Sequence, residues 1–313
     1  MGQLTHDALY YAGDDEFVAG LVPFLRDGLA RGEAAAAAVT RPHIDLLREA
    51  LGGDAGAVWF VDRDEWYQRP TGTIAGWRRV LADANSRGHS YVRIVGEVGF
   101  GPSDRHPTWI RYESAVNRVF AQAPAWIVCP YDTRRLPPSV LADARRTHPV
   151  VADPRRRPSD RYLPPEVLLR SVPEPMPRVT GPPVLELRLM LDDTVTSARH
   201  TVDNAVATGG WLGPGRLDDL LLALTEVAGN SVRYGAGRRQ LRLWAPGWGV
   251  VCEVADEGPG PANPLVGYCP PEDLPERGQG LWIAQQVCDR LSIEHRDGVT
   301  RVRFTIRSRE PSL

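Results

Sequence analysis

Residues 222–235 read LALTEVAGNSVRYG, and this stretch decides how the second half of the chain is interpreted. Its apolar residues recur at helical spacing, so it predicts the end of an amphipathic helix. Glu226 and Asn230 are four residues apart and therefore lie one turn apart on the same helix face. A carboxylate and an amide oxygen in this arrangement can hold Mg²⁺ and orient a nucleophile, although a solvated helix face often shows the same spacing.

Two glycine-containing motifs follow in order. Asp256–Gly260 reads DEGPG directly after an apolar strand, and Arg277–Leu281 reads RGQGL at the start of a predicted helix. A carboxylate at a strand end can accept a hydrogen bond from an exocyclic amine such as that of adenine, and glycines let backbone approach a flat ring. Glycines before a helix expose N–H groups that can hold phosphate. Each motif alone is equally typical of an ordinary turn, but the three together indicate a nucleotide site.

The order, spacing and settings of these motifs resemble the N, G1 and G2 boxes of the GHKL ATPase superfamily, the Bergerat fold, over about residues 184–307. Within that superfamily the chain looks most similar to the small anti-sigma-factor serine kinases. The order of predicted strands and helices in this half indicates an α+β domain in which one mixed sheet carries helices on one face, and the resemblance implies the same fold. It also implies ATP and Mg²⁺ as cofactors.

Carried over position by position, the resemblance implies a role for each motif residue. Glu226 is the expected general base for a serine hydroxyl, and Asn230 is the expected Mg²⁺ ligand. Asp256 is expected to read the adenine amine, with Thr300 nearby. The other residues expected to contact the nucleotide are Gly258, Gly260, Arg277, Gly278, Gly280 and Leu281. The lid of the family often has arginine between its glycines, whereas this chain has Gln279, so nucleotide binding is more firmly implied than phosphotransfer.

The resemblance implies a serine/threonine protein kinase whose substrate is a serine of an anti-anti-sigma antagonist. A sigma factor is the second candidate partner, and a homodimer is the candidate assembly. Two other interpretations stay open. The first is a module in which nucleotide sets partner affinity without phosphotransfer. The second is a histidine kinase with His200 as acceptor, but His200 falls inside the first predicted helix of the ATP-binding domain and lacks an acidic neighbour.

The first half of the chain alternates short apolar runs with segments of helical period. This pattern predicts an α/β domain with a parallel, doubly wound sheet covered by helices on both faces. The expected strands are 8–11, 35–39, 58–61, 91–95 and 126–129, and the expected helices are 14–31, 41–51, 73–87, 107–122 and 137–147.

Several stretches of this half resemble the MEDS sensory domain of bacterial regulators, over about residues 3–151. They are His6–Tyr11, Asp15–Phe17, Phe24–Leu29, Arg93–Glu97, Tyr112–Glu113 with Asn117, Cys129–Asp132 and Thr147–Pro149. The resemblance implies a sensor of RecA-like fold whose ligand, a small molecule or a protein, is unspecified. Residues that follow strands are candidates for binding, since open α/β sheets bind ligands at strand ends. His6, Glu97, Glu113 and His148 are candidates for one polar cluster.

Composition excludes several classes of protein. All 37 cations are arginine, so the chain lacks the lysine of a Walker A loop or a Schiff base. The net charge of −2 argues against nucleic-acid and membrane partners, and the four cysteines show no zinc or redox spacing. No leader or spanning segment is recognised, which predicts a cytoplasmic protein.

Nine prolines between residues 154 and 183 indicate a boundary between two domains. The expected division is a sensory domain over residues 1–152, a linker over 153–183 and an ATP-binding domain over 184–313.

Overall fold

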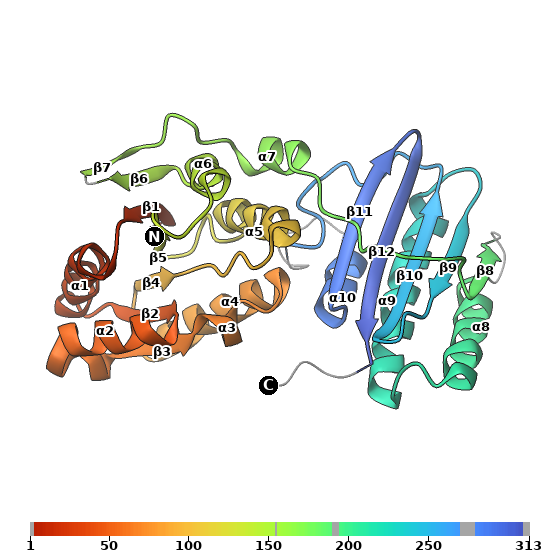
Figure 1. Ribbon diagram of the computed structural model, residues 1–313, viewed down its shortest axis with the longest axis horizontal. Helices are drawn as coiled ribbons and strands as arrows, with labels where there is room; N and C mark the ends of the chain where they lie inside the picture. Colours follow the sequence, from red (N-terminus) through yellow and green to blue (C-terminus); the bar gives the residue numbers. More distant parts are fainter. Residues whose placement is uncertain (1–2, 154, 190–193, 270–278, 309–313) are drawn as a thin grey trace. The chain divides into compact units, whose positions relative to one another are not determined.

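The computed structural model describes residues 3–153, 155–189, 194–269 and 279–308. The chain divides into two compact units, Met1–Val172 and Pro173–Leu313 (Figure 1).

Within the described residues, the first unit contains a seven-stranded sheet with the order β3-β2-β4-β5-β1-β6-β7. Its strands are β1 (Thr5–Tyr11), β2 (Ala34–Val39), β3 (Val58–Asp62), β4 (Val92–Gly96), β5 (Ala125–Asp132), β6 (Val150–Asp153) and β7 (Arg155–Pro158). All described pairings are parallel except that of β6 with β7. The predicted parallel character of this sheet is therefore confirmed, and the RecA-like fold stays a prediction.

Helices cover both faces of this sheet. They are α1 (Asp14–Ala30), α2 (Arg41–Leu51), α3 (Arg63–Trp66), α4 (Pro70–Ser86), α5 (His106–Val119), α6 (Pro138–Thr147) and α7 (Pro165–Ser171), with 3₁₀ turns at Gly52–Ala57 and Ser103–Arg105. Ala35 and Ala37 of β2 belong to a core with Phe17 of α1 and Leu47 of α2. Ala36 of β2 points to the other face and is also buried, as expected for a sheet covered on both sides. No described helix of the chain is long and apolar enough to span a bilayer.

The proline-rich segment contributes structure to both units. Its first part forms the edge strand β7 and the helix α7, which packs against α5. Arg111 of α5 donates hydrogen bonds to the carbonyl oxygens of Leu169 and Val172, both at 2.6 Å. The remainder, from Pro173 onward, belongs to the second unit.

The second unit contains a sheet with the order β11-β12-β10-β9-β8. Its strands are β8 (Leu185–Arg188), β9 (Gln240–Trp244), β10 (Gly249–Asp256), β11 (Arg290–Arg296) and β12 (Val299–Arg307). The predicted mixed sheet is wrong, because every described pairing is antiparallel. β10 and β11 run in the same direction, but β12 lies between them, so they do not form a parallel pair.

One face of this sheet is apolar and carries α8 (Thr194–Gly209), α9 (Pro214–Tyr234) and α10 (Gln279–Val287), as Figure 1 shows. Val250, Cys252 and Val254 of β10 belong to the core on this face. Helices on one face are what the sequence analysis predicts. Alternate residues of the same strand, such as the buried Glu253, point to the other face.

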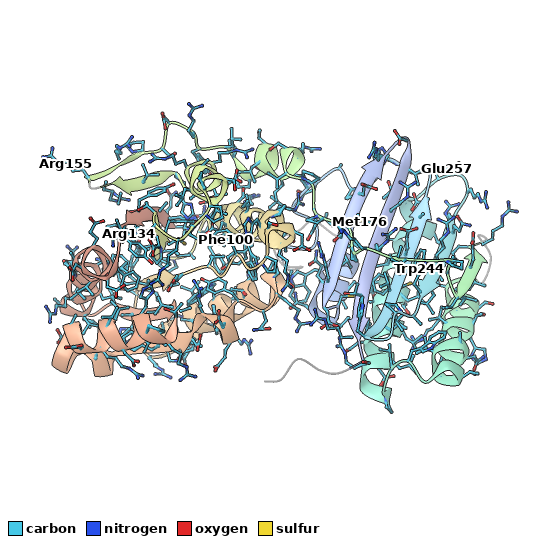
Figure 2. The ribbon with its side chains drawn as sticks, viewed as in Figure 1. Phe100, Arg134, Arg155, Met176, Trp244 and Glu257 are labelled. Carbon is cyan, nitrogen blue, oxygen red and sulfur yellow. The ribbon has the colours of Figure 1, made fainter. Side chains whose placement is uncertain are left out.

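The other face is polar and is crossed by residues 175–181. Arg303 of β12 donates to Glu253 at 2.5 Å and to the carbonyl oxygen of Pro177 at 2.7 Å. Arg290 donates to the carbonyl oxygen of Pro175 at 2.7 Å, and the indole of Trp244 donates to that of Gly181 at 3.3 Å. Trp244 is labelled in Figure 2, as is Met176 of the crossing segment. The start of the second unit is thus held on its sheet by backbone carbonyls.

Candidate nucleotide site and strand-end pocket

Helix α9 carries the acid and the amide of the candidate site. Glu226 and Asn230 are both half-buried, on the side of α9 that α10 packs against. In the described part of the chain, neither side chain has a hydrogen-bond or ion-pair partner. A half-buried carboxylate and amide without protein partners are available to a ligand.

Gly280, at the start of α10, closes this side of the site. A Cβ at this position would clash with Oε2 of Glu226 and would lie 3.3 Å from Nδ2 of Asn230. The structure therefore brings together two motifs about fifty residues apart, and a side chain at residue 280 would displace the flexible Glu226 carboxylate. Leu281, the next residue, is buried in the core with its side chain. Arg277 and Gly278 lie outside the described residues.

Asp256 ends β10 and is buried, with 7% of its surface exposed. Its Oδ2 accepts a hydrogen bond from the Ser231 hydroxyl at 2.7 Å, and its Oδ1 accepts one from the Gly258 N–H at 2.8 Å. Each carboxylate oxygen has two lone pairs, so both keep a further acceptor position. A Cβ on Gly235 would lie 2.5 Å from the carboxyl carbon, and a Cβ on Gly258 would lie 2.7 Å from Oδ1. The carboxylate is therefore lined by glycine backbone.

Thr300 of β12 stands opposite Asp256 in the sheet register. Its hydroxyl donates to the carbonyl oxygen of Gly258 at 2.8 Å and contacts Nδ1 of His295 at 2.9 Å. Gly260 has a φ of +72°, and a Cβ there would lie 3.1 Å from the Thr300 hydroxyl. These contacts hold the turn after β10 against β12 and fix where Asp256 points.

These residues fit an adenine nucleotide with Mg²⁺. Glycines at 235 and 258 let the backbone pack directly against the Asp256 carboxylate, where a Cβ has no room. The carboxylate keeps free acceptor positions, and these suit the exocyclic amine of adenine. The amide oxygen of Asn230 is a ligand of the type that Mg²⁺ takes alongside phosphates and water. The roles of the individual residues stay predictions.

Three features define the class of GHKL-like ATPase domains. They are an antiparallel sheet with helices on one face, an acid–amide pair on the central helix, and a carboxylate at a strand end. Residues 190–306 match the family described as histidine kinase-like ATPase domain. Residues 5–149 match the MEDS family, the MEthanogen/methylotroph, DcmR Sensory domain. The chain therefore carries an N-terminal MEDS domain and a C-terminal histidine kinase-like ATPase domain, and ATPase domains of this kind imply ATP binding.

Solved structures similar to the chain include the RsbU and RsbW domains of Rv1364c from Mycobacterium tuberculosis, with 21% sequence identity and a TM-score of 0.32. The match covers 47% of this chain and 41% of that chain, so the chain spans about two fifths of its length. A TM-score this low does not establish a shared fold or function. No curated protein matches the chain.

The MEDS domain has a pocket of about 290 Å³ where β1, β2 and β3 end. Its lining includes Asp14, which follows β1, Thr40, which follows β2, and Asp62, which ends β3. Arg41 lies at the rim and pairs with Asp62 at 2.9 Å. The carboxyl ends of parallel strands are where open α/β sheets bind ligands, so this pocket is the candidate ligand site of the domain.

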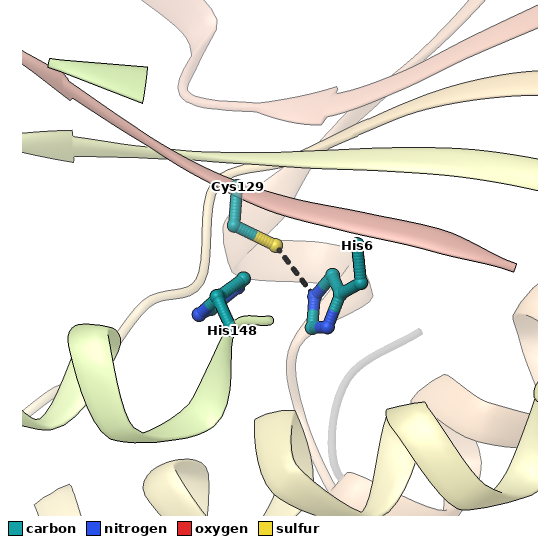
Figure 3. A group of neighbouring side chains, drawn as sticks. All are labelled: His6, Cys129 and His148. Atoms are coloured by element: carbon teal, nitrogen blue, oxygen red, sulfur yellow. Dashed lines mark hydrogen bonds between the residues drawn. The ribbon is translucent and has the colours of Figure 1, made fainter. Parts of the chain in front are cut away.

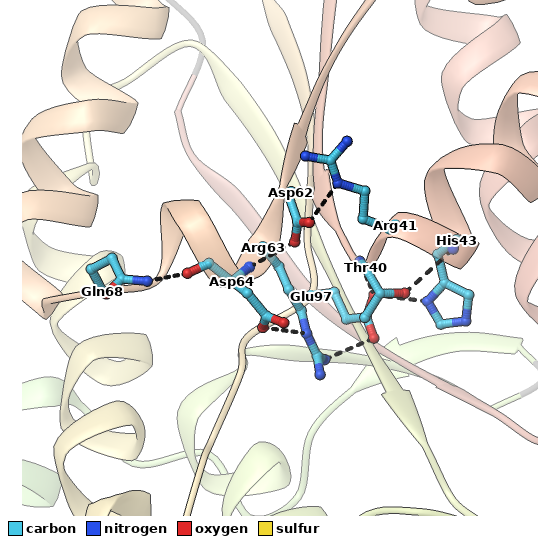
Figure 4. Close-up of polar contacts among 8 residues, drawn as sticks. All are labelled: Thr40, Arg41, His43, Asp62, Arg63, Asp64, Gln68 and Glu97. Atoms are coloured by element: carbon cyan, nitrogen blue, oxygen red, sulfur yellow. Dashed lines mark hydrogen bonds and ion pairs between the residues drawn. The ribbon is translucent and has the colours of Figure 1, made fainter. Parts of the chain in front are cut away.

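Glu97 holds two residues of the pocket lining, Thr40 and His43, in place (Figure 4). Its Oε2 accepts from the Thr40 N–H at 3.0 Å and from Nδ1 of His43 at 2.8 Å, and its Oε1 accepts from Arg63 at 2.9 Å. The His43 ring stacks on Phe17 at 4.0 Å. Burial, together with the Glu97 carboxylate, raises the pKa of nearby Tyr11 above its usual range. The buried carboxylate thus orients the strand ends that line the pocket.

The structure separates the polar residues that the sequence analysis groups together. Glu97 lies with His43 and Arg63, two residues that were not among the predicted site residues. The signal that could have found them is their position, because both lie just after the ends of strands, where α/β sheets bind ligands. His6 and His148 instead lie together on the face covered by α5 and α6, with ring centroids 4.0 Å apart.

Glu113 is also on that side and accepts hydrogen bonds from Tyr131 and Thr147. Arg93 is buried by ion pairs with Asp27 at 2.8 Å and Glu33 at 2.6 Å, which gives it a structural role.

Proposed function

We propose that the ATPase domain binds Mg·ATP and acts as a serine/threonine protein kinase of the anti-sigma-factor type. The observation that carries the proposal is the pair Glu226 and Asn230. Both lack protein partners in the described residues, face Gly280 at the start of α10, and share a domain with the glycine-lined carboxylate of Asp256. The sequence resemblance supports the choice of kinase class.

In this proposal each residue has one task. Asp256 accepts a hydrogen bond from the adenine amine, and Gly235 and Gly258 let the backbone pack against its carboxylate. Asn230 is the protein ligand of Mg²⁺, and bound Mg·ATP supplies the phosphoryl group and the charge neutralisation of its transfer. Glu226 orients the incoming serine hydroxyl and takes its proton. The backbone N–H groups at the start of α10 bind phosphate.

The proposed substrate is a serine on an anti-anti-sigma antagonist, and a sigma factor is the second proposed partner. The MEDS domain would then be the sensory part, with a small molecule or a protein as ligand at the strand-end pocket. Support for these partners comes from the sequence resemblance, and the pocket beside Arg41 and Asp62 supports the sensory role.

Incubation of the full chain with γ-labelled ATP, Mg²⁺ and a candidate antagonist tests the proposal. Acid-stable label on a serine of the antagonist supports it. Binding of ATP without any label transfer would favour a nucleotide-dependent binding module. Acid-labile label on the chain itself would favour a histidine kinase; the candidate acceptor His200 is exposed on α8, a helix of the ATPase domain.

The sensory role has its own test. The full chain is compared with a shorter chain that begins at Pro173, because residues 175–181 hydrogen-bond to β9, β11 and β12 and must be kept. A regulatory domain typically changes affinity or turnover by roughly 5–150-fold. Equal nucleotide affinity and equal phosphorylation rates in the two chains, with and without candidate ligands, would contradict the sensory role.

A further inference from the structure

Three metal-ligating side chains from distant parts of the MEDS domain meet in its interior (Figure 3). They are His6 of β1, Cys129 of β5 and His148, which directly follows α6. All three are buried, with at most 4% of their surface exposed. One possible ligand atom from each lies within 4.8 Å of the others, and Sγ of Cys129 is 3.4 Å from Nε2 of His6.

Strand pairing places two of these residues side by side. β1 and β5 are parallel neighbours, with His6 opposite Ile127 and Ala8 opposite Cys129. His6 and Cys129 therefore point to the same face of the sheet, one step of the side-chain repeat apart. His148 enters from the helix layer on that face, where its ring contacts the His6 ring.

The surroundings of His6 fix which of its nitrogens carries hydrogen. Nδ1 lies 3.0 Å from Oδ1 of Asn117. The amide nitrogen of Asn117 donates to the carbonyl oxygen of Thr147 at 2.7 Å, which orients the Asn117 side chain so that its oxygen faces the histidine. An amide oxygen only accepts, so Nδ1 of His6 is the donor and Nε2 presents a lone pair toward Cys129.

His148 is held in the same way. Its Nδ1 lies 2.9 Å from both the carbonyl oxygen of Ala144 and the hydroxyl of Thr147. The carbonyl oxygen only accepts, and the hydroxyl has its own acceptors in Glu113 and the Asp143 carbonyl, so Nδ1 carries the hydrogen. Nε2 of His148 therefore presents a second lone pair. In the part of the chain that the structure describes, this buried Nε2 has no hydrogen-bond partner.

Two inward lone pairs thus share a buried site with one thiol. The thiol has one hydrogen and can satisfy only one of the two nitrogens, which leaves a buried acceptor unpaired at a cost of about 1–3 kcal/mol. A metal ion accepts all three electron pairs at once. Backbone or amide acceptors on the outer nitrogen are also the arrangement that orients histidine ligands in metal sites.

We propose that Nε2 of His6, Sγ of Cys129 and Nε2 of His148 bind one divalent transition-metal ion of the zinc class. Tetrahedral zinc with bonds of about 2.3 Å to sulfur and about 2.0 Å to nitrogen separates these ligand atoms by roughly 3.5 Å. The 3.4 Å between Cys129 and His6 agrees with that separation. Binding replaces the hydrogen of the thiol by the metal and releases one proton to solvent.

Three protein ligands leave the fourth position of a tetrahedral ion open. Among the described residues no further histidine, cysteine, aspartate or glutamate joins the cluster. Open positions are typical of zinc ions that exchange water or a small ligand. A small anionic or thiol-containing molecule is the class of ligand that would fill such a position.

The test uses the full chain expressed in medium containing cobalt in place of zinc, because a buried site is filled as the chain folds. Elemental analysis is expected to find about one cobalt per chain, and thiolate coordination gives a sulfur-to-cobalt absorption in the near ultraviolet. Cys129→Ser is expected to lose both signals. Cys252→Ser, which changes another fully buried cysteine in the ATPase domain, is the matched control and keeps them.

A second measurement needs no variant, in case Cys129→Ser fails to fold. X-ray absorption of the wild-type cobalt protein is expected to show one sulfur and two imidazole nitrogens bound to the metal, with water or a small ligand in the fourth position. A folded wild-type chain without bound metal, a shell without sulfur, or an unchanged absorption in Cys129→Ser would each overturn the proposal.

Discussion

The nucleotide site of the ATPase domain is built mainly on one helix, whereas the histidine–cysteine cluster of the MEDS domain is built by strand pairing. Glu226 and Asn230 share a face of α9 because they are one helical turn apart. His6 and Cys129, which are 123 residues apart in the chain, share a face because β1 pairs with β5. The first arrangement depends on local spacing, and the second depends on the complete topology of the domain.

This difference has a consequence for how each site responds to substitution. A residue on a helix can be changed while its neighbours keep their places, so loss of its chemistry is separable from loss of fold. A residue in the MEDS cluster lies inside the core, where a change of shape is felt by everything around it. The following predictions use this contrast, beginning with the largest expected effect.

Glu226→Gln is expected to lower the phosphotransfer rate by roughly 10²–10⁴-fold while nucleotide affinity stays unchanged. The carboxylate is needed as a base only when the serine hydroxyl attacks, and glutamine keeps its shape. Rates come from label transfer to the antagonist and affinities from calorimetry. Asp218→Asn, an exposed acid on the same helix, is the control and should turn over normally. A wild-type rate in Glu226→Gln would refute the general-base role.

Asp256→Asn is expected to weaken binding of an adenine nucleotide by about 1–3 kcal/mol, because one carboxylate oxygen becomes an NH₂ donor. The substitution also disturbs the hydrogen bonds from Ser231 and Gly258, so thermal unfolding is recorded alongside calorimetry. Asp297→Asn in the β11–β12 turn is the control, since that side chain is 87% exposed. Undiminished affinity in a folded Asp256→Asn chain would contradict the adenine assignment.

Gly280→Ala is expected to lower turnover by about tenfold with little change in stability, because small misplacements of a catalytic group are costly. The added methyl clashes with Oε2 of Glu226, and that flexible side chain can move aside at little cost to the fold. Gly215→Ala is the matched control, because a Cβ there meets no atom within 4 Å. Equal turnover in both variants would contradict a catalytic role for the Glu226 carboxylate in its observed position.

The last prediction concerns Glu113, in the interior of the MEDS domain, and its effect is on stability and not on turnover. Burial raises the pKa of Glu113 from 4.5 to about 8, so the folded chain binds its proton more tightly than the unfolded chain does. The stability that Glu113 contributes should therefore fall as pH rises from about 4.5 to about 8. Glu113→Gln removes this part of the slope.

The measurement is urea unfolding of the wild-type chain and Glu113→Gln at several pH values, with a chelator present. The Glu33→Gln variant is unsuitable as a control because Glu33 pairs with the buried Arg93. Glu49→Gln, a change at an exposed acid of α2, is suitable and should keep the wild-type slope. Parallel curves for wild type and Glu113→Gln would contradict the shifted pKa.

Local signals explain which elements were predictable from sequence. The helix predicted over residues 41–51 is observed over Arg41–Leu51, where the Thr40 hydroxyl accepts the His43 N–H and caps the first turn. The strand β7 was not predictable from its apolar content, because Arg155–Pro158 is exposed throughout. Charged residues and proline are typical of an edge strand, because they prevent strands of other molecules from pairing with the exposed edge.

Arrangements that depend on the topology of a sheet were harder to predict from the sequence. The order of elements does not reveal that β12 lies between β10 and β11, so the mixed sheet was wrongly predicted. Glu97 and His148 both follow regular elements, yet they lie in different clusters because strand ends and sheet faces are set by pairing. The motif of Glu226, Asn230 and Gly280, in contrast, was recognisable before any fold was known.

One calorimetric comparison tests the nucleotide site most directly. The wild-type full chain is titrated with ADP and with inosine diphosphate, both with Mg²⁺. The two bases differ at C6, where adenine has a donor amine and hypoxanthine has an acceptor oxygen, and at N1, which accepts in adenine and carries a hydrogen in hypoxanthine. Asp256 can only accept, so ADP is expected to bind at least about tenfold more tightly. Equal affinities, or no binding of ADP, would contradict a site in which Asp256 reads adenine.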